Sequence, residues 1–162
     1  MKTIVFAGGC FWGVEAYFKL VEGVVDTEVG YIDGRKPHPT YEEVCAGIGH
    51  AEAVWVKYDE NVVTLVTLLN HLFNIVDPTL RNRQGPDIGV QYRTGLYNFT
   101  AEEVPMIENY LVELAKQYTR KVHIDVKQTA TFYPAEAYHQ DYLDKNKNGY
   151  CHVNLSSVSR IK

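Results

Sequence analysis

The sequence predicts an α+β fold, a two-layer sandwich in which helices pack on a mixed β-sheet. Runs of apolar and β-branched residues typical of strands mingle with apolar stripes at helical spacing, without a strict strand–helix–strand rhythm. The length of 162 residues suits one compact domain with its own hydrophobic core. We therefore expect a single domain over residues 1–162, in which about residues 144–162 form an irregular C-terminal tail.

The first third of the chain predicts three strands and one helix. Residues 3–7 are an apolar run that ends at a glycine pair, and apolar residues then recur at helical spacing as far as Val21. Residues 24–31 are rich in β-branched residues, and residues 51–58 alternate like a strand. Residues 36–40 contain two prolines and are predicted to be a loop.

The middle of the chain predicts a capped helix and a further strand. Thr64 is a suitable N-cap for an apolar stripe that runs to Val76, and Asp77-Pro78 ends that helix. Residues 82–89 form a polar, glycine-bearing loop, and residues 90–97 predict a strand.

The last third predicts a helix with an apolar face from Val104 to Tyr118. Its start is open, because Thr100 with Glu103 resembles a capping box while Pro105 prefers the first turn. One or two strands are expected within 122–132 and a helix at 135–143.

Composition excludes several classes of partner. The net charge is −4 and no Lys/Arg run is present, so we expect no nucleic-acid partner. The first residues do not read as a signal peptide, and no apolar stretch is long enough to span a bilayer. Three cysteines do not make a disulfide scaffold, which favours a cytoplasmic location. The sequence has no heptad repeat of apolar residues that would predict a coiled coil, so we expect a monomer.

Cys10 is the first candidate for chemistry, because it lies where a strand gives way to a helix. Amide groups at a helix N-terminus favour a thiolate and are expected to lower the thiol pKa. The neighbouring glycines are expected to leave the backbone open to a substrate, and Phe11 with Trp12 places two aromatic side chains beside the sulfur. The alternative is a buried structural cysteine in a tight turn.

The other two cysteines differ in their surroundings. Cys45 lies on an apolar segment and is predicted to be a small packed hydrophobe. Cys151 follows a polar stretch that we expect to be mobile, where a thiol could trap a sulfenic acid or simply be a free tail cysteine. No C-x-x-C or H-x-x-x-H pair is present, so no metal site is predicted.

Glu52 is the most informative carboxylate. In a strand over 51–58 it shares a face with Val54 and Val56, and an apolar face raises a carboxyl pKa. We expect a protonated acid there, the alternative being a strand-end glutamate facing solvent. Such an acid beside a thiolate can protonate the group that the thiolate attacks.

Two further segments are rich in polar groups. Asp87, Tyr92 and Arg93 lie on a loop with two glycines that forms either part of a site or a surface turn. In the predicted helix at 135–143, Tyr138 and Tyr142 are one turn apart with His139 beside them, although a lone helical histidine is more often structural.

Several blocks, in order along nearly the whole chain, resemble those of the A-type peptide methionine sulfoxide reductases. The most specific block is Gly9-Cys10-Phe11-Trp12-Gly13. The others are Gly30-Tyr31, Pro39-Thr40-Tyr41, Gly49-His50-Ala51-Glu52-Ala53-Val54, Asn82-Arg83-Gln84-Gly85, Gln91-Tyr92-Arg93, Phe132-Tyr133-Pro134-Ala135-Glu136, Tyr138-His139-Gln140-Asp141-Tyr142-Leu143 and Gly149-Tyr150-Cys151. With this resemblance we expect a ferredoxin-like core inside the sandwich.

The resemblance implies reduction of methionine S-sulfoxide, free or in proteins, with no cofactor and with electrons from thioredoxin or another dithiol. Cys10 would be the nucleophile that becomes a sulfenic acid, Glu52 the proton donor and Cys151 the resolving cysteine. The implied substrate-binding residues are Phe11 and Trp12 against the methyl group, Tyr41 and Tyr92 on the sulfoxide oxygen, and Asp87, His139 and Tyr142 as supporting polar groups.

This chain departs from the family pattern at a few positions. Val76 stands where histidine is frequent before Asp-Pro, Thr94 where serine is usual, and Lys147 where proline is common. No second cysteine follows Cys151, so thioredoxin is expected to attack a Cys10–Cys151 disulfide directly.

Two other functions fit part of the pattern. A cysteine hydrolase would use Cys10 with His139 as its base, but it leaves Glu52 and Cys151 without a role. A non-catalytic domain could bind oxidised methionine in an aromatic pocket, and it would keep its function in a Cys10→Ser variant.

Overall fold

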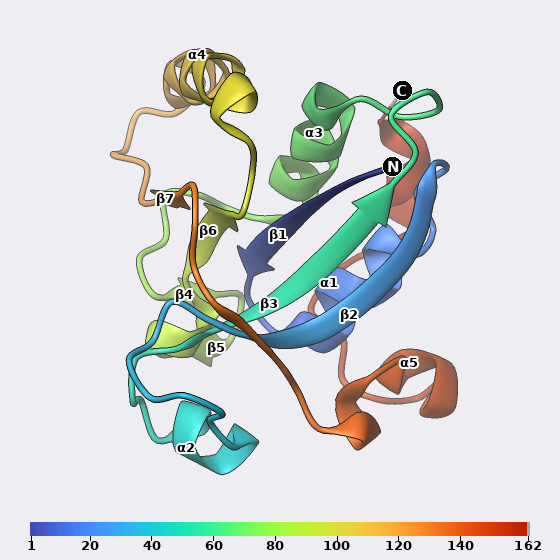
Figure 1. The fold of residues 1–162 in the computed structure, drawn as a ribbon, viewed down its shortest axis with the longest axis vertical. Coiled ribbons are helices and arrows are strands. Elements are labelled where there is room, and N and C mark those ends of the chain that lie inside the picture. Colours follow the sequence, from blue (N-terminus) through green and yellow to red (C-terminus); the bar gives the residue numbers. More distant parts are fainter. Residues whose placement is uncertain (162) are drawn as a thin grey trace.

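A six-stranded mixed sheet forms the centre of the computed structural model, which describes residues 1–161 (Figure 1). Its strand order is β7-β6-β1-β3-β2-β8, and β6 and β7 are parallel while the other neighbours are antiparallel. The strands are β1 (Lys2–Gly8), β2 (Val24–Ile32), β3 (Ala51–Tyr58), β6 (Thr94–Tyr97), β7 (Asp125–Lys127) and β8 (Phe132–Pro134). A separate two-stranded ribbon pairs β4 (Arg83–Gln84) with β5 (Asp87–Ile88).

Helices cover one face of this sheet and an extended segment crosses the other. The α-helices are α1 (Phe11–Phe18), α2 (Tyr41–Cys45), α3 (Leu65–Ile75), α4 (Val104–Ala115) and α5 (Tyr142–Lys145). Short 3-10 helices are η1 (Val90–Tyr92), η2 (Ala101–Glu103), η3 (Ala137–His139) and η4 (Leu155–Arg160). In Figure 1 the orange segment that follows β7 crosses in front of β3 and β2, whereas α1 and α3 lie behind them.

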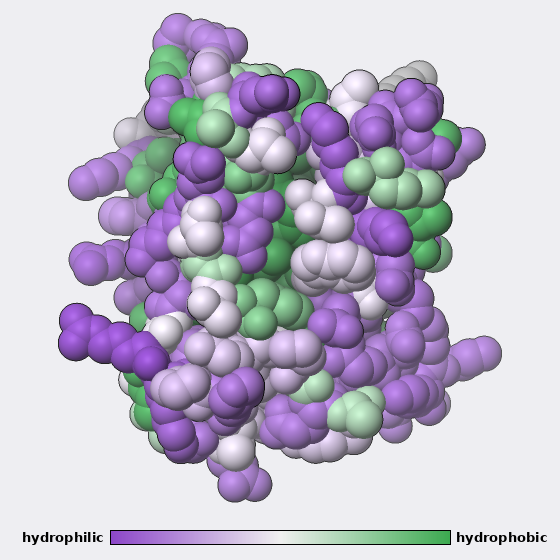
Figure 2. All heavy atoms as spheres, viewed as in Figure 1, coloured by the Kyte–Doolittle hydropathy of each residue, from purple (hydrophilic) through white to green (hydrophobic). Residues whose placement is uncertain are grey.

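The larger core lies between the sheet and the helices. Alternate residues of β1 and β3, such as Phe6 and Val54, pack against Val14 of α1 and Leu72 of α3. Each fully buried apolar side chain of this size contributes about 1.5–3 kcal/mol to folding. The opposite face carries a smaller cluster that includes Val5, against which Phe132 and other half-buried residues pack. Figure 2 shows an otherwise largely hydrophilic surface with an apolar patch over the middle of this face.

The predicted sandwich of a mixed sheet with packed helices is confirmed, and so are the strands expected at 3–7, 24–31 and 51–58. The ferredoxin-like core stays a prediction. The helix expected from Thr64 is also confirmed, since the backbone N–H of Thr67 donates to the Thr64 hydroxyl at 3.2 Å. Both signals near the start of α4 are used, because a capping box closes η2 and Pro105 then occupies the first turn of α4.

Two predicted elements are wrong in part, those at 90–97 and 135–143. Of the strand expected at 90–97, residues 90–92 form η1, because the chain turns at Gly89 (φ +150°) and the Tyr92 N–H donates to the Gly89 carbonyl. The one or two strands expected within 122–132 are confirmed as β7 and the start of β8. The helix expected at 135–143 is broken into η3 and α5 at Asp141, which has a φ of +53°. The helix α2, the β4–β5 ribbon within the predicted loop 82–89 and the 3-10 helix η4 within the predicted tail were not predicted.

The C-terminal stretch packs against the helices. Val153 and Ser157 are buried, and the Asn74 amide of α3 donates to the Ser157 hydroxyl at 3.0 Å. The same amide donates to the Tyr17 hydroxyl of α1 at 3.1 Å. These buried polar contacts join α1, α3 and η4, so the segment that follows Cys151 is held in place.

Candidate active site

Cys10 lies between the end of β1 and the start of α1, and 7% of its surface is exposed. Gly9 before it has a φ of +89°, and a Cβ there would come within 2.8 Å of the Gln84 side chain. A Cβ on Gly13 would lie 3.2 Å from Cys151 Sγ. The expectation that these glycines leave the backbone open is therefore wrong, because other parts of the chain fill the space beside them.

The pKa of the Cys10 thiol is raised, and the expected net lowering by the helix N-terminus is wrong. Burial is the largest cause, followed by the negative charge of Glu52. The backbone N–H groups of Trp12 and Gly13 do lower the pKa by hydrogen bonding to the sulfur, but their effect is smaller. Protonation of Glu52 removes one of the charges that oppose formation of the Cys10 thiolate.

Glu52 of β3 is the buried acid of this site, with 1% of its surface exposed. Burial raises its pKa to about 8, which leaves most of the carboxyl protonated at neutral pH. Oε1 accepts the N–H of Phe11 at 3.2 Å, and that residue directly follows Cys10. Oε2 is buried without a hydrogen-bond partner. The alternative of a solvent-facing Glu52 is thus excluded, and its free oxygen is available to a bound group.

Aromatic rings surround the two residues that follow Cys10. The ring of Trp12 stacks on Tyr142 with centroids 3.8 Å apart, and its indole N–H donates to His139 Nδ1 at 2.9 Å. Phe11 is buried, with ring centroids 5.1 Å from His139 and 6.4 Å from Tyr41. Phe11 therefore lies inside the protein, whereas Trp12 is partly buried. The rings nevertheless form a continuous apolar group beside the sulfur.

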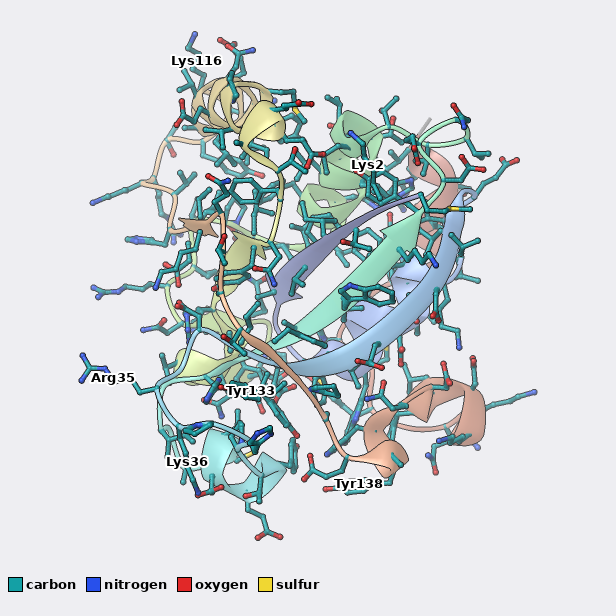
Figure 3. All side chains as sticks on the ribbon, in the orientation of Figure 1. Lys2, Arg35, Lys36, Lys116, Tyr133 and Tyr138 are labelled. Carbon is teal, nitrogen blue, oxygen red and sulfur yellow. The ribbon has the colours of Figure 1, made fainter. Side chains whose placement is uncertain are left out.

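Buried side chains fix the segment that carries His139 and Tyr142. Glu15 of α1 accepts the N–H of Asp141 at 2.8 Å, and the Gln140 amide pairs with both backbone groups of Val29 at 2.8 Å. These contacts hold Asp141 in its left-handed conformation and break the predicted helix. Tyr138 and Tyr142 are therefore not neighbours on one helix, and Tyr138 lies at the lower edge of the molecule, exposed (Figure 3).

Tyrosine hydroxyls and Asp87 complete the polar side of the site. Burial is the main cause of the raised pKa of both Tyr41 and Tyr92. Negative charge on Glu52 raises both pKa values further. Asp87 lies close enough to raise the pKa of Cys10, Glu52 and Tyr92, and it accepts the hydroxyl of Tyr150 at 2.8 Å. The structure thus brings these groups together around Cys10.

The other two cysteines are also free thiols. Cys45 is exposed rather than packed as predicted, because α2 places it one turn after Tyr41, whose hydroxyl it contacts. Cys151 lies against the first turn of α1, as its proximity to Gly13 shows, and its thiol donates to the Val153 carbonyl at 3.3 Å. The sulfur expected on a mobile tail is therefore seated beside the Cys10 turn.

Some residues of the site had no role in the sequence-based interpretation. Glu136 accepts the hydroxyl of Tyr31 at 2.7 Å and the N–H of Tyr41 at 3.0 Å, so it fixes the entry to α2. Tyr150 orients Asp87, and Glu15 orients Asp141. Each contact joins segments far apart in the sequence, so spacing along the chain does not reveal it. Two of these residues, Glu136 and Tyr150, lie in the family blocks Phe-Tyr-Pro-Ala-Glu and Gly-Tyr-Cys, which are the signals that could have identified them.

No cluster of three or more histidine, cysteine or acidic side chains within residues 1–161 is placed to hold a metal ion. In the same part of the chain, no helix has the length and apolar character needed to cross a membrane. A cavity of about 590 Å³ lies beside β6 and is lined by Arg81, Arg93 and Lys121 among others, but by none of the aromatic residues around Cys10.

Replacement of Trp12 by phenylalanine tests the contribution of the indole. The variant keeps a ring against Tyr142 but loses the hydrogen bond to His139, a net loss of about 1 kcal/mol. We expect kcat/KM for a methionine sulfoxide peptide to fall about fivefold. Trp55→Phe is the matched control, since Trp55 packs on the opposite face of the sheet. Equal effects of the two variants would contradict a role for Trp12 in this site.

The sequence as a whole matches known proteins. Residues 2–161 match the family described as "Peptide methionine sulfoxide reductase". The peptide methionine sulfoxide reductase MsrA of Clostridium tetani is 50% identical over 158 residues, which cover 97% of this chain and 96% of that protein. MsrA of Lachnoclostridium phytofermentans is 51% identical over 99% of this chain and 98% of its own length.

Solved structures agree with this result. Mxr1 from Saccharomyces cerevisiae in reduced form has a TM-score of 0.88 and 37% identity, covering 94% of this chain and 91% of that one. Methionine sulfoxide reductase A of Corynebacterium diphtheriae has a TM-score of 0.80 and 36% identity, covering 93% of this chain and 77% of that one. Both the match over residues 2–161 and these identities place the chain in one family. The chain belongs to the peptide methionine sulfoxide reductase family.

Proposed function

We propose that this protein reduces the S epimer of methionine sulfoxide, free or in proteins, with Cys10 as the nucleophile and Glu52 as the acid. Thiol-dependent reduction of methionine sulfoxide is the activity of the family. The single observation that carries the assignment of these two residues is the buried carboxyl of Glu52 next to the Cys10 turn, with a pKa of about 8 and one free oxygen.

In the first step, the Cys10 thiolate attacks the sulfoxide sulfur while Glu52 gives its proton to the sulfoxide oxygen. Tyr41 and Tyr92 hydrogen-bond that oxygen, and the aromatic group around Phe11 and Trp12 receives the methyl group. The sulfur–oxygen bond of the substrate breaks and the oxygen passes to Cys10. Methionine leaves, and Cys10 becomes a sulfenic acid. Asp87, His139 and Tyr142 hold the surrounding groups in place.

In the second step, the Cys151 thiol attacks the sulfenic acid, a disulfide forms and water leaves. The position of Cys151 Sγ against Gly13, one helical turn from Cys10, supports this role. Thioredoxin then reduces the disulfide. A solved complex of a related protein, "Mxr1 from Saccharomyces cerevisiae in complex with Trx2", supports this partner; it has 27% identity and a TM-score of 0.61.

A hydrolase that uses His139 as its base is not favoured. The lone pair of His139 Nδ1 accepts the indole N–H of Trp12, so the ring proton is on Nε2, and neither nitrogen is hydrogen-bonded to Cys10. Burial also lowers the pKa of His139. We further propose a cytoplasmic monomer, in keeping with three unpaired cysteines and the lack of a heptad seam in the sequence.

Separated R and S sulfoxides of an N-blocked methionine test the proposed reaction. We expect methionine only from the S epimer, with dithiothreitol or with thioredoxin, thioredoxin reductase and NADPH. Turnover of the R epimer at the same rate, or release of an acyl product from an ester, would contradict the proposal.

A Cys151→Ser variant separates the two steps. Because the variant retains Cys10 as the nucleophile and Glu52 as the acid, one equivalent of methionine per enzyme should form without reductant, as in the unaltered protein. Thioredoxin-dependent turnover should fall at least about a hundredfold, since the disulfide that thioredoxin attacks cannot form. A coupled NADPH assay measures the fall, and undiminished thioredoxin turnover would show that Cys151 does not resolve Cys10.

A further inference from the structure

His152 lies beside both reactive cysteines. Its Nε2 is 3.0 Å from the point where a Cβ on Gly9 would lie, just before Cys10. Its Nδ1 is 3.3 Å from the corresponding point on Gly13, and Cys151 Sγ is 3.2 Å from that same point. The imidazole ring therefore packs against the backbone on both sides of Cys10. Its Nδ1 and the Cys151 sulfur both lie within 3.3 Å of one point, the Cβ position of Gly13.

Both ring nitrogens of His152 are buried without a hydrogen-bond partner. The Gly8 carbonyl lies close enough to favour the protonated ring, but not in hydrogen-bond geometry. A buried polar group left unpaired costs about 1–3 kcal/mol, and native proteins keep few of them. His152 is thus retained in a position that is unfavourable for stability, next to the one thiol that must lose a proton during resolution.

The Cys151 thiol needs a base at that step. In the reduced protein it donates to the Val153 carbonyl, which cannot accept the proton outright. A thiol must lose its proton to attack, because the thiolate is the nucleophile. Burial lowers the pKa of His152 more than the charge of Asp87 raises it, so the ring is neutral and able to accept a proton.

We propose, on the basis of the function proposed above, that His152 is the base that takes the Cys151 thiol proton when Cys151 attacks the Cys10 sulfenic acid. The sulfur–sulfur bond forms as the sulfur–oxygen bond of Cys10 breaks. Cys151 is oxidised and the Cys10 sulfur is reduced. The departing hydroxide takes the proton back from the imidazolium and leaves as water, so no further oxidant or reductant is needed.

A cavity of about 340 Å³ borders His152 on the side of α3 and β4, and Asp77 and Gln84 also line it. It gives the water that is released in this step a route away from the Cys10 turn. The titratable groups near His152 are Cys10 and Cys151 beside α1, Asp87 on β5, and Asp77 and Tyr118, which line the same cavity.

His152→Gln and His152→Asn test this role in single turnovers without reductant, between pH 5.5 and 9. The methionine burst and the Cys10–Cys151 disulfide are followed separately, the latter by intact mass after trapping free thiols and sulfenic acid. We expect an unchanged methionine burst and a disulfide step about a hundredfold slower at pH 7 in both variants. His123→Gln, beside β7 and away from Cys10, is the matched control.

The pH dependence separates a base from a structural residue. In the unaltered protein the disulfide rate should level off above the His152 pKa, which lies below its usual value near 6.5. In the variants, which lack this base, the rate should show no such plateau and should keep rising across the pH range, because the thiolate is the nucleophile. A uniform slowing with an unchanged profile, or no slowing, would overturn the role of His152. Absence of the methionine burst in the unaltered protein would instead refute the proposed function.

Discussion

Cys10→Ser is expected to abolish turnover of methionine S-sulfoxide, by at least about 10⁴-fold with either dithiothreitol or thioredoxin. The serine hydroxyl is not a nucleophile for the sulfoxide sulfur and cannot carry the oxygen as a sulfenic acid. Because Cys10 is buried and serine is nearly the same size, the fold should persist. Methionine release and the midpoint of thermal unfolding measure the two effects.

This variant also tests the remaining alternative, a domain that only binds oxidised methionine. A binding domain would keep its full function after the substitution. We expect Cys10→Ser to bind a sulfoxide peptide and release no methionine. Residual turnover above about one part in a thousand, in a preparation free of unaltered protein, would contradict the nucleophilic role.

Glu52→Gln is expected to lower kcat about 10²–10⁴-fold, because the amide cannot protonate the sulfoxide oxygen. In the unaltered protein the rate of methionine formation should rise with pH and level off above about pH 8, because Glu52 then loses its proton while the raised pKa of Cys10 still limits thiolate formation. In the variant, which lacks this titrating acid, the rate should keep rising above pH 8 as more thiolate forms. Rates of methionine formation in single turnovers between pH 6 and 10 measure both effects, and Glu108→Gln, exposed on α4, is the control.

The same variant should be more stable than the unaltered protein. The folded pKa of Glu52 is about 8, above the value near 4.3 of an unfolded glutamate, so the folded state holds a proton that the unfolded state loses. Stability linked to Glu52 is therefore complete below about pH 4 and declines as the pH rises towards 8. Glu52→Gln should gain about 3 kcal/mol in free energy of unfolding at pH 7 and almost nothing at pH 4.

Denaturant titrations of both proteins at these two pH values check this gain. Equal stability at pH 7 would mean that Glu52 is not forced to stay protonated by burial. A variant that is less active and more stable is the pattern expected of a residue whose burial serves the reaction rather than the fold.

Local sequence patterns were sufficient to place the site residues that lie at strand ends. Alternation along 51–58 placed Glu52 on the apolar face of β3, and the glycine pair placed Cys10 at the turn into α1. The direction of the Cys10 pKa shift could not be found in this way. The helix amides were visible in the sequence, but the burial of the sulfur and the approach of Glu52 and Asp87 depend on tertiary packing.

Long-range side-chain contacts account for the other differences. The segment around His139 has a helical pattern, yet Glu15 accepts the backbone N–H of Asp141 and the Gln140 side chain pairs with the backbone of Val29 on β2, so no helix forms. Cys151 follows a polar stretch that suggested mobility, whereas buried residues such as Val153 seat it beside Gly13. The partners of the His139 segment, Glu15 in α1 and Val29 in β2, cannot be identified from spacing along the chain. The resemblance to the family identified these segments as important without giving their geometry.

We propose that Cys10 attacks the sulfoxide sulfur and that Cys151 resolves the resulting sulfenic acid. The most direct measurement is one turnover with methionine S-sulfoxide and no reductant, followed by alkylation and mapping of disulfides by mass spectrometry. We expect one methionine per protein and a Cys10–Cys151 disulfide, both unchanged in a Cys45→Ser variant. A Cys10–Cys45 disulfide, or methionine without any disulfide, would contradict the resolving role of Cys151.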